Sequence, residues 1–127
     1  MTQDEIPVVI IDDNESVRKV LGDVVAAFGY RVFTAANAAQ GFREVRERRP
    51  HVVLLDLAMP GLDGHAVFEH LISSSTPSSI VILSGNSDEM AARALLQRGA
   101  FDYLPKPVNL AHLQSVIAAA AAAAPPA

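Results

Sequence analysis

Short apolar runs alternate along the chain with segments in which apolar residues recur every three or four positions. The runs, which are mostly rich in β-branched residues or leucine, are "VVII" (8–11), "RVFTA" (31–35), "VVLL" (52–55), "IVIL" (80–83) and "DYL" (102–104). The first, third and fourth are apolar throughout, as strands covered on both faces are. The pattern predicts a parallel sheet flanked by helices, with these three strands at its centre.

Helical spacing fills the segments between the predicted strands. Apolar residues from Val17 to Phe28 recur at this spacing and end at Gly29, which is a good helix stop. A second helix is predicted over 38–48, although Gly41 weakens it. The remaining predicted helices lie around 68–72, from a cap at Ser87, Asp88 and Glu89 to Gly99, and from Leu110 onward.

Polar residues stand where the predicted strands end. They are Asp12 and Asp13 after the first strand, Asp56 after the third, Ser84 after the fourth and Lys106 after the fifth. In open parallel sheets the working groups gather at the carboxyl ends of the strands. We therefore expect these five side chains to converge on one edge of the sheet.

Three carboxylates at one edge repel one another, and a proton, a lysine or a hard cation must relieve them. Mg²⁺ suits such a site because it binds one or two carboxylates and keeps waters for a phosphate-bearing ligand. Lys106 and Ser84 could bind phosphoryl oxygens. A carboxylate such as Asp56 between a metal and a lysine can act as the nucleophile in phosphoryl transfer and form an acyl phosphate.

With these residues at its strand ends, the chain closely resembles the receiver domain of two-component response regulators. The motifs "IIDDN", "LLDLAMPGLDG", "LSGN" and "YLPKP" stand in the family's order between Ile6 and about Ile117. The resemblance implies a flavodoxin-like, doubly wound α/β fold, with a five-stranded parallel sheet of order 2-1-3-4-5 and helices on both faces. It also implies that Asp56 accepts a phosphoryl group from a sensor histidine kinase or a histidine phosphotransfer protein.

The resemblance implies a role for each residue of the site. Asp13, Asp56 and the backbone carbonyl of Ala58 would ligate Mg²⁺ directly, while Asp12 would act mainly through metal-bound water. Lys106 and Ser84 would contact the phosphoryl group. Position 84 carries Ser where Thr is equally familiar, so the hydroxyl that this contact needs is kept.

The resemblance further implies a conformational switch. Phosphorylation in the family is coupled to a shift of the hydroxyl residue, here Ser84, and to inward rotation of an aromatic side chain, here Tyr103. Ala58 and Asn86 occupy positions whose side chains modulate attack by water on the acyl phosphate. The family also has a cis peptide bond between the residues that match Lys106 and Pro107.

Composition and charge narrow the function further. The sequence contains no Cys, which excludes a disulfide framework and a thiolate nucleophile. The net charge of −4 argues against direct nucleic-acid binding, and the cluster "REVRERR" at 43–49 alternates with Glu, as a solvated helix face does. The sequence carries no export signal and no apolar stretch long enough to span a membrane, so we expect a cytoplasmic protein without a membrane partner.

We expect residues 1–117 to form the receiver domain and the Ala- and Pro-rich residues 118–127 to lengthen the last helix or begin a linker. The output would come from a downstream protein or a fused domain absent from this sequence. Such a chain is a self-directed phosphoacceptor, possessing at most autodephosphorylation, and is not a turnover enzyme. Two alternatives are a phosphate-independent binding module and an aspartate-based phosphohydrolase, although the latter usually carries an acid where Ala58 stands.

Overall fold

A computed structural model describes residues 6–58, 64–74, 77–85 and 88–124, and its strands form one parallel sheet of order β2-β1-β3-β4-β5. The strands are β1 (Pro7–Ile11), β2 (Arg31–Ala35), β3 (Val52–Asp56), β4 (Ser79–Ser84) and β5 (Asp102–Pro105). The predicted strand order is confirmed. The three strands that are apolar throughout lie at the centre, because both of their faces are covered.

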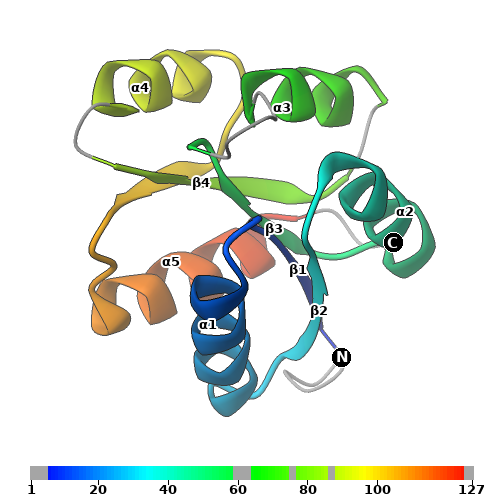
Figure 1. Cartoon of the computed structure of the whole chain (residues 1–127), viewed down its shortest axis with the longest axis vertical. Helices are drawn as coiled ribbons and strands as arrows, with labels where there is room; N and C mark the ends of the chain where they lie inside the picture. Colours follow the sequence, from blue (N-terminus) through cyan, green and yellow to red (C-terminus); the bar gives the residue numbers. More distant parts are fainter. Residues whose placement is uncertain (1–5, 59–63, 75–76, 86–87, 125–127) are drawn as a thin grey trace.

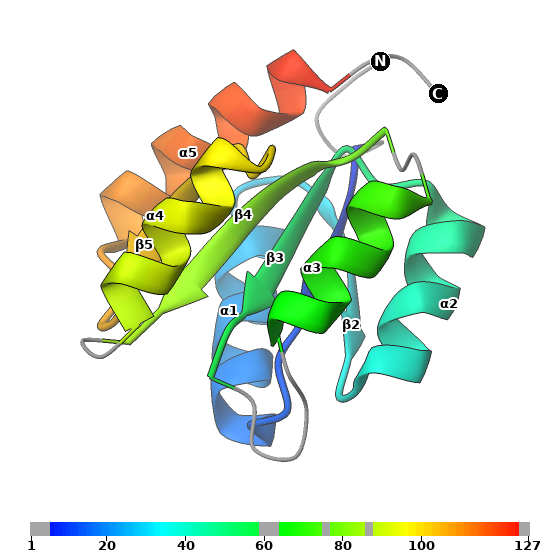
Figure 2. The same cartoon turned by 90° about the horizontal axis from the view of Figure 1, so that it is seen from above.

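Helices cover both faces of this sheet (Figures 1 and 2). They are α1 (Glu15–Ala27), α2 (Ala38–Arg48), α3 (Gly64–Ser73), α4 (Glu89–Gln97) and α5 (Leu110–Ala123). The helices α1 and α5 pack on one face, and α2, α3 and α4 pack on the other. Each face therefore has its own hydrophobic core, and alternate residues of a strand contribute to opposite cores.

Strand β3 shows this division most clearly, since all its residues are buried. Val53 and Leu55 belong to the core beneath α2, α3 and α4, whereas Val52 and Leu54 belong to the core beneath α1 and α5. Full burial of such side chains stabilises the fold by about 1.5–3 kcal/mol each. Asp56 is thereby held at the end of a strand that is buried along its whole length.

Helix α2 is continuous through Gly41, which the sequence pattern had suggested as a weak point. A Cβ atom on Gly41 would lie 2.7 Å from the Cδ1 of Ile11 on β1. The glycine thus allows α2 to pack close to the sheet. The helix ends at Arg49, which has a left-handed φ of 46° and donates its N–H to the carbonyl of Val45.

Helix α5 continues through the alanine-rich segment to Ala123, and Ala120 and Ala121 are buried against the sheet. The side chain of Ser79 donates a hydrogen bond to the carbonyl of Ala120, which ties this end of the helix to β4. In the ranges that the structure describes, no helix is long and apolar enough to cross a membrane.

Candidate functional site

The carboxyl ends of the strands bring the predicted site residues to one edge of the sheet. Asp56 ends β3, Ser84 ends β4, Asp12 and Asp13 directly follow β1, and Lys106 directly follows β5. Within the described ranges, Asp12, Asp56 and Ser84 are the buried polar or charged residues. Burial of such groups is costly unless they are paired, so their concentration at one edge marks a functional site.

The three carboxylates lie close enough to share a cation. One oxygen from each of Asp12, Asp13 and Asp56 lies within 4.8 Å of the other two. Burial raises the pKa of Asp12, the hydrogen bond from Asn14 lowers it, and repulsion from the Asp56 carboxylate raises it again. The surroundings of Asp12 therefore disfavour its ionised form, and a bound cation would stabilise that form.

The oxygens of Asp12 support a magnesium site. Oδ1 accepts a hydrogen bond of 2.9 Å from the backbone N–H of Asn14. Oδ2 is buried, and nothing in the described part of the chain donates to it. A hard cation with oxygen ligands, bound directly or through water, would satisfy this oxygen and relieve the repulsion. The residues present thus fit Mg²⁺.

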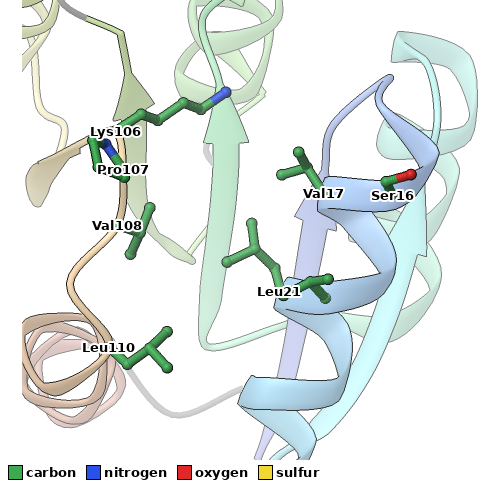
Figure 3. Close-up of a pocket in the computed structure, with 8 residues that line it drawn as sticks. Ser16, Val17, Leu21, Lys106, Pro107, Val108 and Leu110 are labelled. Atoms are coloured by element: carbon green, nitrogen blue, oxygen red, sulfur yellow. The ribbon is translucent and has the colours of Figure 1, made fainter.

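Asp56 is held by the lysine that the sequence predicted. Its Oδ1 accepts hydrogen bonds from Lys106 Nζ at 2.9 Å and from the backbone N–H of Ala58 at 3.1 Å. Figure 3 shows the Lys106 side chain extending toward the end of β3. The Lys106–Pro107 peptide bond is cis, and the Lys106 N–H donates to the carbonyl of Ser84 at 2.7 Å.

The hydroxyl of Ser84 is buried, and it has no hydrogen-bond partner among the residues that the structure describes. In the sheet register Asp56 lies beside Leu83, so Ser84 stands one residue beyond the acid on the neighbouring strand. A buried hydroxyl can donate one hydrogen bond and accept two. Ser84 is thus free to donate to a group that arrives at this edge.

Of the two residues predicted to modulate attack by water, Ala58 is exposed two positions after Asp56. Asn86 lies outside the described residues. Ser87, which was predicted as part of the α4 cap, also lies outside the described residues. Asp88 precedes α4, but its side chain makes no capping hydrogen bond, and its Oδ2 instead accepts from the Gly85 N–H at 3.4 Å.

Tyr103, the predicted switch residue, is half-buried on β5 and packs partly against the core beneath α4. Its hydroxyl donates to Glu89 Oε1 at 3.3 Å. Arg93 Nη2 donates to the same oxygen at 3.0 Å. The hydrogen bond from Arg93 is the main reason that the pKa of Glu89 lies below its usual value. Tyr103 is thereby joined to the first turn of α4.

Two residues at this edge, Asn14 and Arg18, were not singled out by sequence reasoning. The side chain of Asn14 caps α1, which its place before a helical segment could have indicated. Arg18 donates to the carbonyl of Asp12 at 2.9 Å, a contact that depends on how α1 lies on the sheet. A Cβ atom on Gly64 would lie 2.8 Å from the Cα of Leu57, so the start of α3 packs directly on the backbone behind Asp56.

An apolar groove of about 360 Å³ opens beside the site, between α1 and the segment that joins β5 to α5 (Figure 3). Residues of α1, of this segment and of the start of α5 line it: Ser16, Val17, Val20, Leu21, Lys106, Pro107, Val108 and Leu110. Two of the lining side chains are well exposed, Val20 at 59% and Leu110 at 52%. Lys106 thus borders both the groove and the carboxylate cluster.

The fold and the site define a class: a doubly wound α/β domain with a magnesium-type carboxylate cluster and a lysine at the carboxyl edge of its sheet. Comparison with known families makes the class specific. The family described as "Response regulator receiver domain" matches residues 8–118. The chain belongs to this family, whose function is to accept a phosphoryl group in two-component signalling.

Curated relatives are longer than this chain. The DNA-binding transcriptional regulator NtrC of Escherichia coli (strain K12) is 36% identical over 101 residues, which are 80% of this chain and 22% of that protein. The KDP operon transcriptional regulatory protein KdpE of the same strain is 35% identical over 109 residues, which are 85% of this chain and 48% of that protein. The matched segments therefore cover less than half the length of either relative.

Solved structures agree with the family assignment. A response regulator receiver domain protein from Clostridium thermocellum superposes with a TM-score of 0.87 at 28% identity, over 92% of this chain and 94% of that one. The receiver domain of NtrX from Brucella abortus gives 0.86 at 26% identity, over 91% and 98%. These comparisons favour neither the phosphohydrolase nor the phosphate-independent module.

Proposed function

We propose that Asp56 is the residue of this chain that accepts the phosphoryl group, from a phosphohistidine donor and with Mg²⁺, and that the modification switches a protein-interaction surface. The observation that carries the proposal is the placement of Asp56. Its carboxylate is only 3% exposed, is bound by Lys106 and lies beside two further acids. No other described carboxylate combines burial, a cation and a candidate metal site.

The chemistry follows from the hydrogen bonds of Asp56. The described donors to this carboxylate bind Oδ1, which leaves Oδ2 as the oxygen that we propose attacks phosphorus. The new O–P bond forms as the P–N bond to the donor imidazole breaks, and the imidazole keeps the electron pair. Lys106 and the Ser84 hydroxyl donate to the transferred oxygens and stabilise their charge.

Asp13, Asp56 and the carbonyl of Ala58 would hold Mg²⁺, and Asp12 would hold a water of the ion. The ion supplies positive charge that the crowded carboxylates need and that favours the approach of an anionic phosphoryl group. Two features of Asp12 support this ligand set: its pKa is raised, and its Oδ2 has no partner among the described residues. Ala58 and Asn86 would modulate attack by water on the product and so influence autodephosphorylation.

The donor is a protein, a sensor histidine kinase or a histidine phosphotransfer protein. A donor that brings its histidine to Asp56 must cover the surface around Lys106, which includes the apolar groove. Exposed Val20 and Leu110 give this groove apolar surface for a protein contact. The groove therefore supports a protein partner at the phosphorylation site, in addition to small phosphodonors.

The switch would consist of Ser84 and Tyr103. When the Ser84 hydroxyl moves to the phosphoryl group, the Tyr103 side chain turns inward, and the face formed by α4, β5 and α5 changes. Residues 1–117 would act as the receiver unit and 118–127 would extend it toward an output domain or a separate partner. The partial coverage of NtrC and KdpE supports an output outside this sequence.

The test is intact-mass measurement after incubation with acetyl phosphate, with and without Mg²⁺. We expect the wild-type chain to gain one phosphoryl group only with Mg²⁺, and hydroxylamine to remove it, as it does an acyl phosphate. Asp56→Asn should show no gain. Asp23→Asn, an exposed aspartate on α1 paired with Lys19, is the matched control and should behave as the wild type does.

Two outcomes would contradict the proposal. The first is an equal gain in Asp56→Asn, which would place the phosphoryl group elsewhere. The second is the absence of any gain in the wild-type chain under conditions in which Mg²⁺ is shown to bind by a shift in thermal stability, which would favour a phosphate-independent module.

A further inference from the structure

A chain of hydrogen bonds ties Tyr103 on the edge strand to α4. The tyrosine hydroxyl and Arg93 both donate to Glu89 Oε1, at 3.3 Å and 3.0 Å. Glu89 and Arg93 are one helical turn apart, so the arginine orients the carboxylate toward the strand. The glutamate is thus the link between β5 and the first turn of the helix.

Tyr103 lies on the same face of the sheet as Ser84. In the register of β4 with β5, Tyr103 is beside Ile82, and Ser84 is two residues further along β4. Residues two apart on a strand share a face, and Ile82 and the Tyr103 side chain both pack in the core beneath α4. Diagonal neighbours of this kind are about 7–8 Å apart, within reach of an aromatic side chain. The position of Tyr103 therefore affects the space beside the Ser84 hydroxyl.

Among the described residues, few side-chain contacts hold the first turn of α4 on the sheet. The buried residues of the helix are Ala92 and Leu95. Asp88 binds the Gly85 N–H in the loop after β4, at 3.4 Å, and Glu89 binds Tyr103. Because only Ala92 and Leu95 of this helix are fully buried, each polar contact contributes appreciably to fixing the first turn on the sheet.

We propose that Glu89 is a positioning residue that holds the Tyr103 side chain against α4 and so opposes the change driven by a phosphoryl group on Asp56. The inference rests on the proposed function, in which the tyrosine turns inward and its hydroxyl must leave Glu89. A contact made in the unphosphorylated state alone shifts the equilibrium toward that state. Its loss must then tighten the binding of any ligand that favours the other state.

The experiment uses beryllium fluoride with excess Mg²⁺, because this complex mimics an acyl phosphate on a carboxylate and binds at equilibrium. Its apparent affinity is measured from backbone amide resonances. The tyrosines are labelled with 3-fluorotyrosine, and since the sequence contains two tyrosines, the buried Tyr30 provides a reference ¹⁹F resonance beside that of Tyr103.

We expect Glu89→Ala to raise the apparent affinity for beryllium fluoride about two- to fivefold, as the loss of one exposed hydrogen bond allows. Before any ligand is added, the Tyr103 resonance should shift toward its position in the ligand-bound wild-type chain. Glu89→Gln keeps an oxygen for the tyrosine hydroxyl and should restore most of the wild-type behaviour.

Two variants serve as controls. Glu44→Ala removes a matched ion pair one turn apart, with Arg48 on α2, and should change neither the affinity nor the Tyr103 resonance. Tyr103→Phe removes the other partner of the contact. Adding Glu89→Ala to Tyr103→Phe should therefore leave the affinity unchanged.

Three results would overturn the inference. An unchanged Tyr103 resonance in Glu89→Ala, with normal beryllium fluoride binding, overturns the role of Glu89 and leaves the proposed function intact. The same gain in affinity in the Tyr103→Phe background shows that Glu89 acts without the tyrosine. Failure of the wild-type chain to bind beryllium fluoride with Mg²⁺ overturns the phosphoacceptor site, and the regulatory role of Glu89 with it.

Discussion

The two ends of the sheet differ in how far their polar side chains are satisfied by hydrogen bonds. At the amino end the hydroxyls are satisfied by the backbone: Ser78 donates to the carbonyl of Pro50 at 2.6 Å, and Ser79 donates to the carbonyl of Ala120 at 2.9 Å. His51 Nδ1 is the exception at this end, a buried nitrogen without a partner in the described ranges. These hydroxyls connect elements and contribute to stability.

At the carboxyl end, the buried groups are charged or reactive and are left incompletely satisfied. Asp12 Oδ2 and the Ser84 hydroxyl have no partner in the described part of the chain, and Lys106 is the sole cation on Asp56 there. An unsatisfied buried oxygen destabilises a fold. These unsatisfied oxygens support the proposal that the carboxyl end binds a cation and a phosphoryl group, at a cost in stability that the Ser78 and Ser79 hydroxyls of the amino end do not bear.

The largest effect should come from filling the close contact behind Asp56. We expect Gly64→Ala to lower the free energy of unfolding by about 3 kcal/mol, because its Cβ would lie 2.8–2.9 Å from backbone atoms of Leu57. Gly22→Ala is the matched control, since its Cβ would meet side chains at 3.7 Å or more, and it should stabilise α1 by about 0.5–1 kcal/mol. Urea unfolding measures both, and equal effects would contradict the close packing at the carboxyl end.

The second-largest effect on stability should come from removing the Lys106 ammonium group that binds Asp56. Lys106→Met should lower the free energy of unfolding at neutral pH without metal by about 2 kcal/mol, less than for a fully buried pair because the lysine is 31% exposed. Excess Mg²⁺ should restore part of the loss. Lys19→Met, which removes a pair with both side chains 76% exposed, should change stability by less than about 0.5 kcal/mol. Similar values for the two variants would show that Asp56 does not depend on its lysine.

Replacement of Asp12 should raise the free energy of unfolding without metal, whereas replacement of Lys106 lowers it. Asp12→Asn removes a buried charge but keeps the acceptor for the Asn14 N–H, so we expect about 1 kcal/mol of added stability without metal. The same variant should lose the stabilisation that Mg²⁺ gives the wild-type chain. Thermal unfolding with and without Mg²⁺ measures both, and a variant that Mg²⁺ stabilises fully would exclude Asp12 from the metal site.

The pH dependence of this effect follows from the pKa of Asp12. Because its pKa in the folded chain is raised above the ordinary value of 3.8, the folded state binds the proton more tightly than the unfolded one. The stability that depends on Asp12 is greatest below 3.8 and falls as pH rises through the raised pKa. The advantage of Asp12→Asn should therefore grow with pH above 3.8, and an advantage that shrinks with pH would contradict this cause.

The smallest effect belongs to the amino end. Ser78→Ala should lower the free energy of unfolding by about 0.5 kcal/mol, because one partly buried hydrogen bond to Pro50 is lost. It should leave both the Mg²⁺-dependent stabilisation and the phosphorylation by acetyl phosphate unchanged. A changed response to Mg²⁺ would show that the two ends of the sheet are not independent.

Most of the fold could be predicted because the central strands are apolar throughout. Their runs predicted β1, β3 and β4 to within one residue at each end. The structure extends β1 by Pro7, β3 by Asp56, and β4 by Ser79 and Ser84. The helix most in doubt, α2, is continuous, since Gly41 serves a contact with Ile11. That contact joins two segments far apart in the sequence, so hydrophobic periodicity could not indicate it.

The side chains of the site could be predicted as a group because strand ends meet at one edge, but their contacts could not. The hydrogen bond between Tyr103 and Glu89 depends on the register of β5 and the rotation of α4. The missing partner of Asp12 Oδ2 is likewise visible only after every neighbour has been placed. Both are properties of packing between elements and not of the elements themselves.

The resemblance carried by the sequence motifs predicted the sheet order, and the strand-end positions predicted the convergence of Asp12, Asp13, Asp56, Ser84 and Lys106. The convergence could be predicted because the alternation of strands and helices and the polar residues at strand ends are local patterns. Tertiary structure alone decided which of these groups are buried, which oxygen the lysine binds and which side chain holds Tyr103. Burial and hydrogen-bond geometry depend on atoms brought together from distant parts of the chain, and free energies at the site follow from those distances.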